Sequence, residues 1–288
     1  MPTTTPVVLR ALVDDAAVFP PGNAPLAEAM SRHAVHRDAW YAGCVGPLLV
    51  PAASAADLVR VLDEQDAVAS PRARGPVALV LVARPGADPV TLTAAWSALG
   101  DDPRVQVVGA ELGWYDGWYD DLAGDLPLAV EMPRGPDGDH AFAEVRTAHR
   151  EGLPVVLKFR TGPTATWTWP DEQELATFLR LVALEVPYKL TGGLHHAVRG
   201  SYEVGGVPEE NHGVLNVLVA TSAALAHAGQ DEVAALLAVR DATALADLVA
   251  AWPDATAHRV RGAFTTYGCC TVTDPLGELA DLGLLARP

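Results

Sequence analysis

The sequence has few cysteines, and it shows no pattern that would organise them. Cys44, Cys269 and Cys270 are the three. Two adjacent cysteines and a distant third provide neither a disulfide framework nor the ligand spacing of a zinc knuckle. The pattern predicts a reduced, cytoplasmic protein.

Basic residues and long apolar runs are also scarce. Twenty Lys and Arg stand against 36 Asp and Glu, a formal net charge of −16. Binding to a phosphate backbone needs a basic face, so this balance argues against a nucleic-acid partner. No uninterrupted apolar run approaches the roughly 18 residues of a membrane span. The N-terminus has no basic segment followed by a long apolar one, so no signal peptide is expected. We expect a small-molecule substrate and no membrane partner, and the sequence leaves a homo-oligomer open.

The chain does have a regular alternation of short β-branched runs and Ala/Leu-rich helical stretches. Strands are expected at residues 8–13, 45–50, 77–83, 105–111, 128–131, 155–159, 188–191 and 263–269. Helices are expected at residues 25–35, 55–65, 89–98, 141–151, 171–184 and 210–228, with two more within 231–252. No Gly-x-Gly-x-x-Gly follows the first strand, which argues against a dinucleotide-binding sheet. We therefore predict one α/β domain over residues 1–288, a (β/α)₈ (TIM) barrel with extra helices before its last strand.

Polar residues fall where the apolar strands end. Glu111 and Glu131 end two of them, and Lys158 and Lys189 lie within two others. A lysine in an apolar strand is costly unless it is paired or used. Active sites of barrels form at the C-terminal ends of the strands. We expect these four side chains in one cavity with Asp15, and the two lysines within about 10 Å, because charge pairs act over shorter distances. A purely structural ion pair is the alternative.

The segments around the two lysines supply further candidates. His195 and His196 follow Gly192 and Gly193 after the strand of Lys189, and adjacent residues of an extended chain point to opposite sides. One histidine is then expected in the site and the other beside it. The candidate substrate-binding residues are Arg160, Thr161, Thr191, Gly192 and Gly193. Six other histidines, His33 among them, are expected at the surface or as filler.

Two short motifs resemble the deoxyribose-phosphate aldolase family of class I aldolases. Lys158-Phe-Arg-Thr161-Gly162 is similar to its Lys-x-x-Thr-Gly, and Lys189-Leu-Thr191-Gly192-Gly193 is similar to its Lys-x-Ser/Thr-Gly-Gly. The resemblance implies a (β/α)₈ barrel in which Lys158 forms a Schiff base and Lys189 lowers its pKa. Glu131 and the pair Val13–Asp14 also match strand ends of that family, so the likeness spans about half the barrel.

The chain departs from that family at three places. Leu194-His195-His196 follows the Gly-Gly segment, the third strand has no acidic residue for proton relay, and residues 264–270 are a poor phosphate loop. Glu111 is the substitute for the relay residue, and phosphate specificity is not implied. The segment Lys-x-Thr-x-Gly-Leu-His-His also resembles an uncharacterised bacterial family.

Three functions remain open from the sequence. The first is a lyase or aldolase that acts on a small polar carbonyl compound, with sugar-derived compounds among the candidates, through a lysine Schiff base and without a cofactor. In this reading a neighbouring cation and burial lower the pKa of Lys158 toward 7–8. The second is a metal-dependent lyase or isomerase, in which Glu111, Glu131, Asp15 and one of His195 and His196 hold a divalent ion and a lysine is the base. The third is a non-catalytic sugar-binding barrel.

Overall fold

Eight parallel strands close into a barrel. The computed structural model describes residues 5–68, 75–119, 126–163, 169–204 and 206–287. The barrel strands are β1 (Val13–Asp15), β2 (Val45–Pro51), β3 (Val77–Val82), β4 (Val105–Gly113), β5 (Leu128–Glu131), β6 (Val155–Arg160), β7 (Tyr188–Thr191) and β10 (Phe264–Cys269). They pair in the order β1-β10-β7-β6-β5-β4-β3-β2, which returns to β1. The predicted (β/α)₈ barrel is confirmed.

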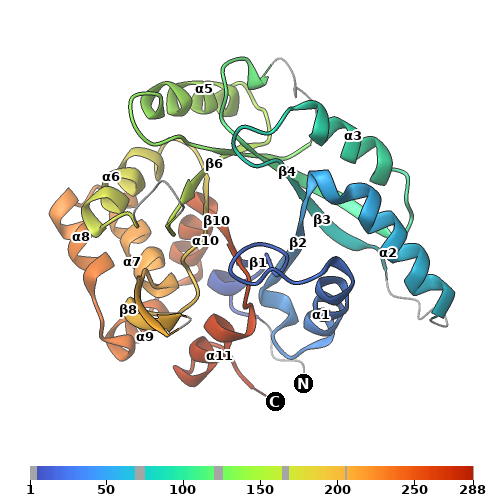
Figure 1. Cartoon of the computed structure of the whole chain (residues 1–288). Helices are drawn as coiled ribbons and strands as arrows, with labels where there is room; N and C mark the ends of the chain where they lie inside the picture. The colour runs from blue at the N-terminus through green and yellow to red at the C-terminus, as the bar shows by residue number, and fades with distance from the viewer. Residues whose placement is uncertain (1–4, 69–74, 120–125, 164–168, 205, 288) are drawn as a thin grey trace.

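Helices surround this barrel on its outside (Figure 1). They are α1 (Leu26–Asp38), α2 (Ala55–Val68), α3 (Val90–Leu99), α5 (Gly138–Arg150), α6 (Glu172–Val182), α7 (Val214–Leu225), α8 (Gln230–Ala238), α9 (Ala242–Ala250), α10 (Asp254–Ala263) and α11 (Thr273–Asp281). The two extra helices expected within residues 231–252 are α8 and α9, and α10 adds a third before β10. Within the described part of the chain, no helix is both long enough and apolar enough to cross a membrane.

The core lies mainly between strands and helices. Tyr188 of β7 is fully buried, its ring stacks on Phe264 of β10, and it meets Phe178 of α6 edge-on. Alternate residues of the same strand, such as Lys189, therefore face the barrel interior, since successive side chains of a strand point to opposite faces. Apolar residues on the outer face leave the inner face free to carry charge.

The prediction for the first strand was wrong. Residues 7–9 form a short 3₁₀ helix, η1 (Val7–Leu9), and the strand begins only at Val13. Between them Ala11 has a positive φ of 45°, which interrupts extended backbone. An apolar run can form a buried turn as well as a strand. Here Val8 and Leu9 are buried in the core as part of the turn. Asp14 and Asp15 consequently lie within the strand and not after it.

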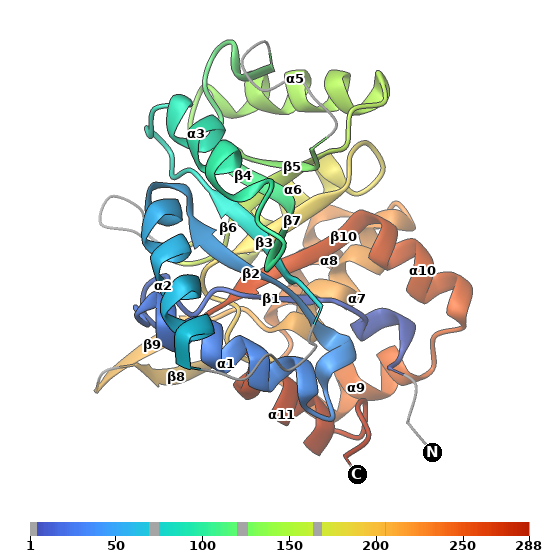
Figure 2. The same ribbon diagram turned by 90° about the vertical axis from the view of Figure 1, so that its right-hand side faces the viewer.

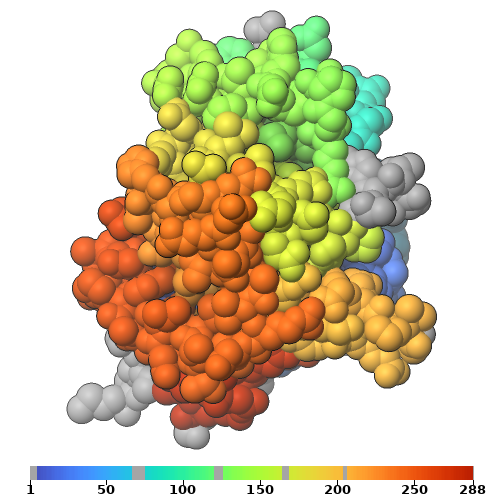
Figure 3. All heavy atoms as spheres, turned by 90° about the vertical axis from the view of Figure 1, so that its left-hand side faces the viewer, coloured from blue at the N-terminus to red at the C-terminus, as the bar shows by residue number. Residues whose placement is uncertain are grey.

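A hairpin precedes α7, where the sequence predicted helix from residue 210. Strands β8 (Gly200–Val204) and β9 (Val207–Asn211) pair antiparallel and project from the barrel (Figures 2 and 3). Pro208 is tolerated because the pair has exposed edges, and Gly206 has the positive φ of a turn. The helix begins after Gly213, where a Cβ would lie 2.3 Å from Cα of Val198.

Candidate active site inside the barrel

Four charged side chains meet inside the barrel near the C-terminal ends of β4, β5, β6 and β7. Glu131 pairs in register with Lys158, and Lys158 pairs in register with Lys189. In-register partners of parallel strands face the same side of a sheet. All three side chains, and that of Glu111 on β4, point inward and are almost fully buried.

A single carboxylate links the two lysines. Nζ of Lys158 lies 2.8 Å from Oε2 of Glu111 and 2.8 Å from Oε2 of Glu131. Nζ of Lys189 contacts the other oxygen of Glu111 and also contacts Asp14. Because both ammonium groups touch one carboxylate, they lie well within the separation of about 10 Å predicted above.

The first strand contributes Asp14 and not Asp15 to this cluster. Asp14 contacts Lys189 and accepts a hydrogen bond of 2.9 Å from the Thr266 hydroxyl. Asp15 points the other way, to α1, where its carboxylate lies 3.0 Å from Nδ1 of His33 and accepts from the Ala17 amide. The prediction that Asp15 lies in the site was wrong by one residue, and in a strand one residue reverses the side chain. His33, expected at the surface or as filler, is buried against Asp15.

Charges in the cluster balance. With Arg160, whose Nε lies 3.0 Å from Oε1 of Glu131, three cations face the three carboxylates of Asp14, Glu111 and Glu131. Burial alone would raise the pKa of Glu111, but the two lysines outweigh burial and hold this pKa at about 2. Burial would likewise raise the pKa of Glu131, but Lys158 and Arg160 outweigh burial and lower this pKa.

The pKa of Lys158 shifts in the opposite direction to the one predicted for it. Burial would lower the pKa of Lys158, but Glu111 and Glu131 outweigh it and raise this pKa above the ordinary value. The pKa of Lys189 is raised in the same way by Asp14 and Glu111. The expectation of a lowered pKa counted the neighbouring cations and missed the two carboxylates that contact each amine. Among the carboxylic acids of the cluster, Asp14 differs from Glu111 and Glu131, because burial outweighs the contact with Lys189 and raises its pKa.

These two residues are the only lysines in the chain. The other 18 of the 20 basic residues are arginines. Every other basic position holds arginine, and the two amines lie together inside the barrel. This count was the strongest signal available in the sequence, and reasoning from strand ends alone did not use it.

The candidate substrate-binding residues have unequal surroundings. Arg160 keeps 26% of its side chain exposed beyond its contact with Glu131. Thr161 is fully buried, and its hydroxyl donates to the Gly192 carbonyl. Gly193 has a φ of 73°, and a Cβ on it would lie 2.8 Å from the Thr161 carbonyl oxygen. Thr161, Gly192 and Gly193 therefore pack the loops after β6 and β7 against each other.

Thr191 instead faces the interior. It stands in register with Arg160 on β6 and with Gly268 on β10. Its side chain is only partly buried. Of the five candidates, Arg160 and Thr191 are thus the two whose side chains are positioned to meet a molecule entering the barrel.

His195 and His196 separate. Nδ1 of His196 lies 2.7 Å from Glu278, and its ring stacks on Tyr202 with centroids 3.3 Å apart, so it ties α11 to the hairpin. Nδ1 of His195 lies 3.5 Å from the Thr271 hydroxyl and 3.7 Å from the sulfurs of Cys269 and Cys270. Burial lowers the pKa of His195, which keeps its ring neutral at pH 7.

The interior wall across from the lysines is apolar. Val82 pairs in register with Glu111, so Val82, Val80 and Leu49 of β2, the in-register partner of Val80, face the same interior. Together with Ala16 they form a small cluster separate from the main core. One side of the barrel interior is ionic and the other is hydrocarbon.

The ligands proposed for a metal inside the barrel are not brought to one point. Glu111 and Glu131 contact lysines, Asp15 faces α1, and His196 contacts Glu278. Across the described residues, one group of three ligand atoms lies within 4.8 Å of one another, and it consists of Asp116, His140 and Glu144 on the outside of the barrel.

Comparison of the chain with models of known protein families, with curated proteins and with solved structures finds no match. The case for a function therefore depends on the residues of the site.

Proposed function

We propose that this barrel is a class I lyase of the aldolase type, which acts on a small polar carbonyl compound through a Schiff base on Lys158. The observation that carries the proposal is that both lysines of the chain are buried in one charge-balanced cluster at the C-terminal ends of the strands. Sites of barrel enzymes lie at this end.

A structural ion pair would not require lysine. Arginine forms bidentate pairs with carboxylates and stays charged, so it serves a permanent ion pair at least as well. Of the two basic side chains, only the lysine amine can give up a proton and attack a carbonyl carbon. The restriction of lysine to these two positions therefore supports amine chemistry.

The raised lysine pKa is compatible with this reaction because the charge is the same before and after it. The lysine ammonium and a carbonyl compound give a protonated imine and water, with one positive charge on each side. Glu111 and Glu131, which hold the Lys158 ammonium, stabilise the iminium in the same position. The iminium then accepts the electron pair of the carbon–carbon bond that breaks.

The amine must be neutral only while it attacks. Contacts run without a break from Lys158 to Glu111, from Glu111 to Lys189, and from Lys189 to Asp14. Among the three carboxylic acids of the cluster, Asp14 is the one whose pKa is raised. Its Oδ1 has no hydrogen-bond partner among the described residues. A shift of protons along this path leaves Lys158 neutral and Asp14 protonated. The protons move back along the same contacts when the imine is protonated.

The remaining side chains would each contact a different part of the substrate. Arg160 supplies exposed N–H donors for a carboxylate or another anionic group. Leu49, Val80 and Val82 face its carbon skeleton. His195, whose lowered pKa favours the neutral ring, can accept the proton that the hydroxyl of the departing fragment loses as this fragment becomes a carbonyl compound.

An isomerase that stabilises an enolate is the second candidate, and the raised lysine pKa favours it. Lysines that remain ammonium groups act as hydrogen-bond donors to a developing oxyanion and form no covalent bond. A metal-dependent reaction would need other ligands than those predicted inside the barrel.

Reduction with borohydride separates these functions. Tag-free protein is incubated with a panel of hydroxyaldehydes and 2-oxo acids, reduced, and weighed intact by mass spectrometry. We expect the wild type to gain the mass of one reduced imine, and Lys158→Arg, which keeps the charge, to gain none. Turnover of a substrate by the Arg variant would exclude a Schiff base on Lys158, and turnover with no mass gain in the wild type would leave the isomerase. Circular dichroism of each variant confirms folding.

A further inference from the structure

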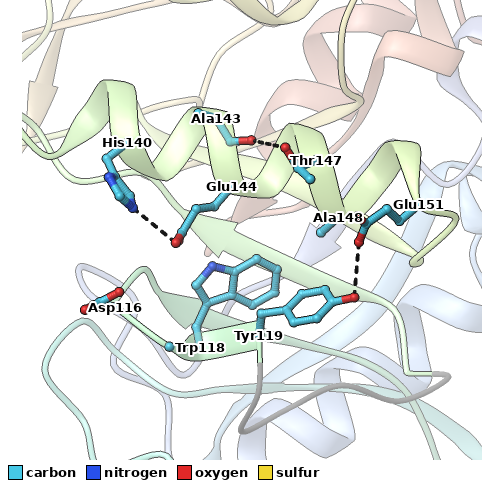
Figure 4. Close-up of a pocket in the computed structure, with 10 residues that line it drawn as sticks. Asp116, Trp118, Tyr119, His140, Ala143, Glu144, Thr147, Ala148 and Glu151 are labelled. Atoms are coloured by element: carbon cyan, nitrogen blue, oxygen red, sulfur yellow. Dashed lines mark hydrogen bonds and ion pairs between the residues drawn. The ribbon is translucent and has the colours of Figure 1, made fainter.

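A second group of polar side chains lies outside the barrel, between the loop after β4 and helix α5. His140 and Glu144 stand one turn apart on α5, and Asp116 comes from the loop (Figure 4). Ligand atoms of the three lie within 4.8 Å of one another. None of them takes part in the reaction proposed above.

The spacing of these atoms suits a metal ion. Nε2 of His140 lies 3.1 Å from Oε1 of Glu144. Two ligands at roughly 2.1 Å from a tetrahedral ion are about 3.4 Å apart, so an ion between them requires little movement. One imidazole and two carboxylates form a donor set suited to zinc and similar divalent ions.

A neighbouring residue already orients one of the ligands. Nε1 of Trp114 donates a hydrogen bond of 2.7 Å to the other oxygen of Glu144. Oε1 of Glu144 is thereby turned to His140, in the way that outer hydrogen bonds orient metal ligands.

An independent observation points to a ligand at the same place. These residues border a pocket of about 480 Å³, and Trp118, which lines it, is 1% exposed. The indole N–H of Trp118 has no hydrogen-bond partner in the described structure. Its nitrogen edge faces the Glu144 carboxylate side of the pocket (Figure 4). A buried donor without a partner destabilises the folded state, and an oxygen ligand in the pocket would remove this cost.

We propose that Asp116, His140 and Glu144 bind a divalent transition-metal ion of the zinc class, whose open coordination position faces this pocket. The oxygen ligand in that position, water or a small carboxylate, accepts the hydrogen bond of Trp118. Three protein ligands with one open position are the arrangement of reactive and not of purely structural zinc sites.

Titration of tag-free protein with Zn²⁺, followed by calorimetry, tests the site. We expect one ion per chain, and a loss of affinity of at least about tenfold in each of Asp116→Asn, His140→Ala and Glu144→Gln. His258→Ala, at an exposed histidine on α10, is the matched control and should bind as the wild type does. With Co²⁺, the visible spectrum should show nitrogen and oxygen ligands only.

The indole N–H gives a second readout. Its proton resonance, assigned by comparison with Trp118→Phe, should move when Zn²⁺ is added to the wild type. Binding that is equal in all variants would place the ion elsewhere, and no binding at millimolar Zn²⁺ would mean an ordinary side-chain cluster. Either result overturns the proposal and leaves the barrel reaction untouched.

Discussion

Each lysine of the cluster contacts two carboxylates, and Glu111 belongs to both pairs. Every such contact favours the ammonium form and raises the pKa. Since the chain has only two lysines, a protein with ¹³C-labelled lysine gives two lysine signals in NMR. We predict that both titrate above the ordinary pKa of about 10.5. A midpoint near 7–8 for either would contradict the geometry.

Single carboxylates should affect these titrations selectively. Glu131 contacts Lys158 and not Lys189, so Glu131→Gln should lower the pKa of Lys158 alone. Glu111→Gln should lower both, because its two oxygens serve both amines. Equal effects of the two variants on Lys189 would mean that the contacts are wrong.

The neighbouring aspartates should behave as residues of different sites. We predict that Asp14→Asn lowers the pKa of Lys189, whereas Asp15→Asn leaves both lysine titrations unchanged. Asp15→Asn should instead reduce the free energy of unfolding by about 1–3 kcal/mol, because it weakens a buried hydrogen bond to His33. Urea denaturation and the NMR titration together check this assignment.

At the scale of elements, the loops after β6 and β7 position the site by close backbone contact. A Cβ on Gly193 would lie 2.8 Å from the Thr161 carbonyl, at a φ of 73°. Gly152 has a φ of 95° and open space around it. We predict that Gly152→Ala costs about 1–2 kcal/mol for the left-handed backbone alone, and that Gly193→Ala costs more. Urea unfolding of the two variants measures the difference, and equal costs would show that loop contact contributes nothing.

Patterns in the sequence predicted most helices and strands, because most apolar runs of suitable length and periodicity are compatible with one kind of secondary structure. They failed where the local sequence is compatible with more than one structure. Residues 7–9 are apolar enough for a strand, yet they form η1, and the strand starts at Val13. Residues 210 and 211 were predicted as the start of a helix, but they belong to β9 and pair with β8, a partner that local pattern does not reveal.

The site itself was predictable in part. Strand ends pointed to Glu111, Glu131, Lys158 and Lys189, and these four do meet. Whether Asp14 or Asp15 lies in the site depended on where β1 starts, because this decides which side chains of the strand point into the barrel and which point outward. The direction of the lysine pKa depended on which neighbours touch each amine, and only barrel closure decides that.

For the whole molecule, the cluster makes stability depend on pH at both extremes. The pKa of Glu111 falls from 4.5 to about 2 on folding, so its contribution is complete above about 4.5 and disappears as pH falls toward 2. The raised lysine pKa values give a contribution that is present below 10.5 and disappears above it. Asp14, with a raised pKa, partly offsets the acid loss.

We therefore predict a plateau of unfolding free energy between these limits. Urea unfolding across pH 2–12 measures it. Glu111→Gln should flatten the acid limb, and the exposed Glu232→Gln should leave it as in the wild type. Unchanged acid limbs in both variants would show that the cluster does not govern stability at low pH.

The location of the covalent bond tests the account most directly. Wild-type protein reduced with borohydride in the presence of the reacting carbonyl compound offers three amines, the N-terminus and the two lysines. After digestion, peptide mass spectrometry should place the added mass on the peptide that contains Lys158. An adduct on Lys189 would reverse the roles of the two lysines. Turnover of the compound with no adduct on either lysine would contradict the Schiff-base mechanism.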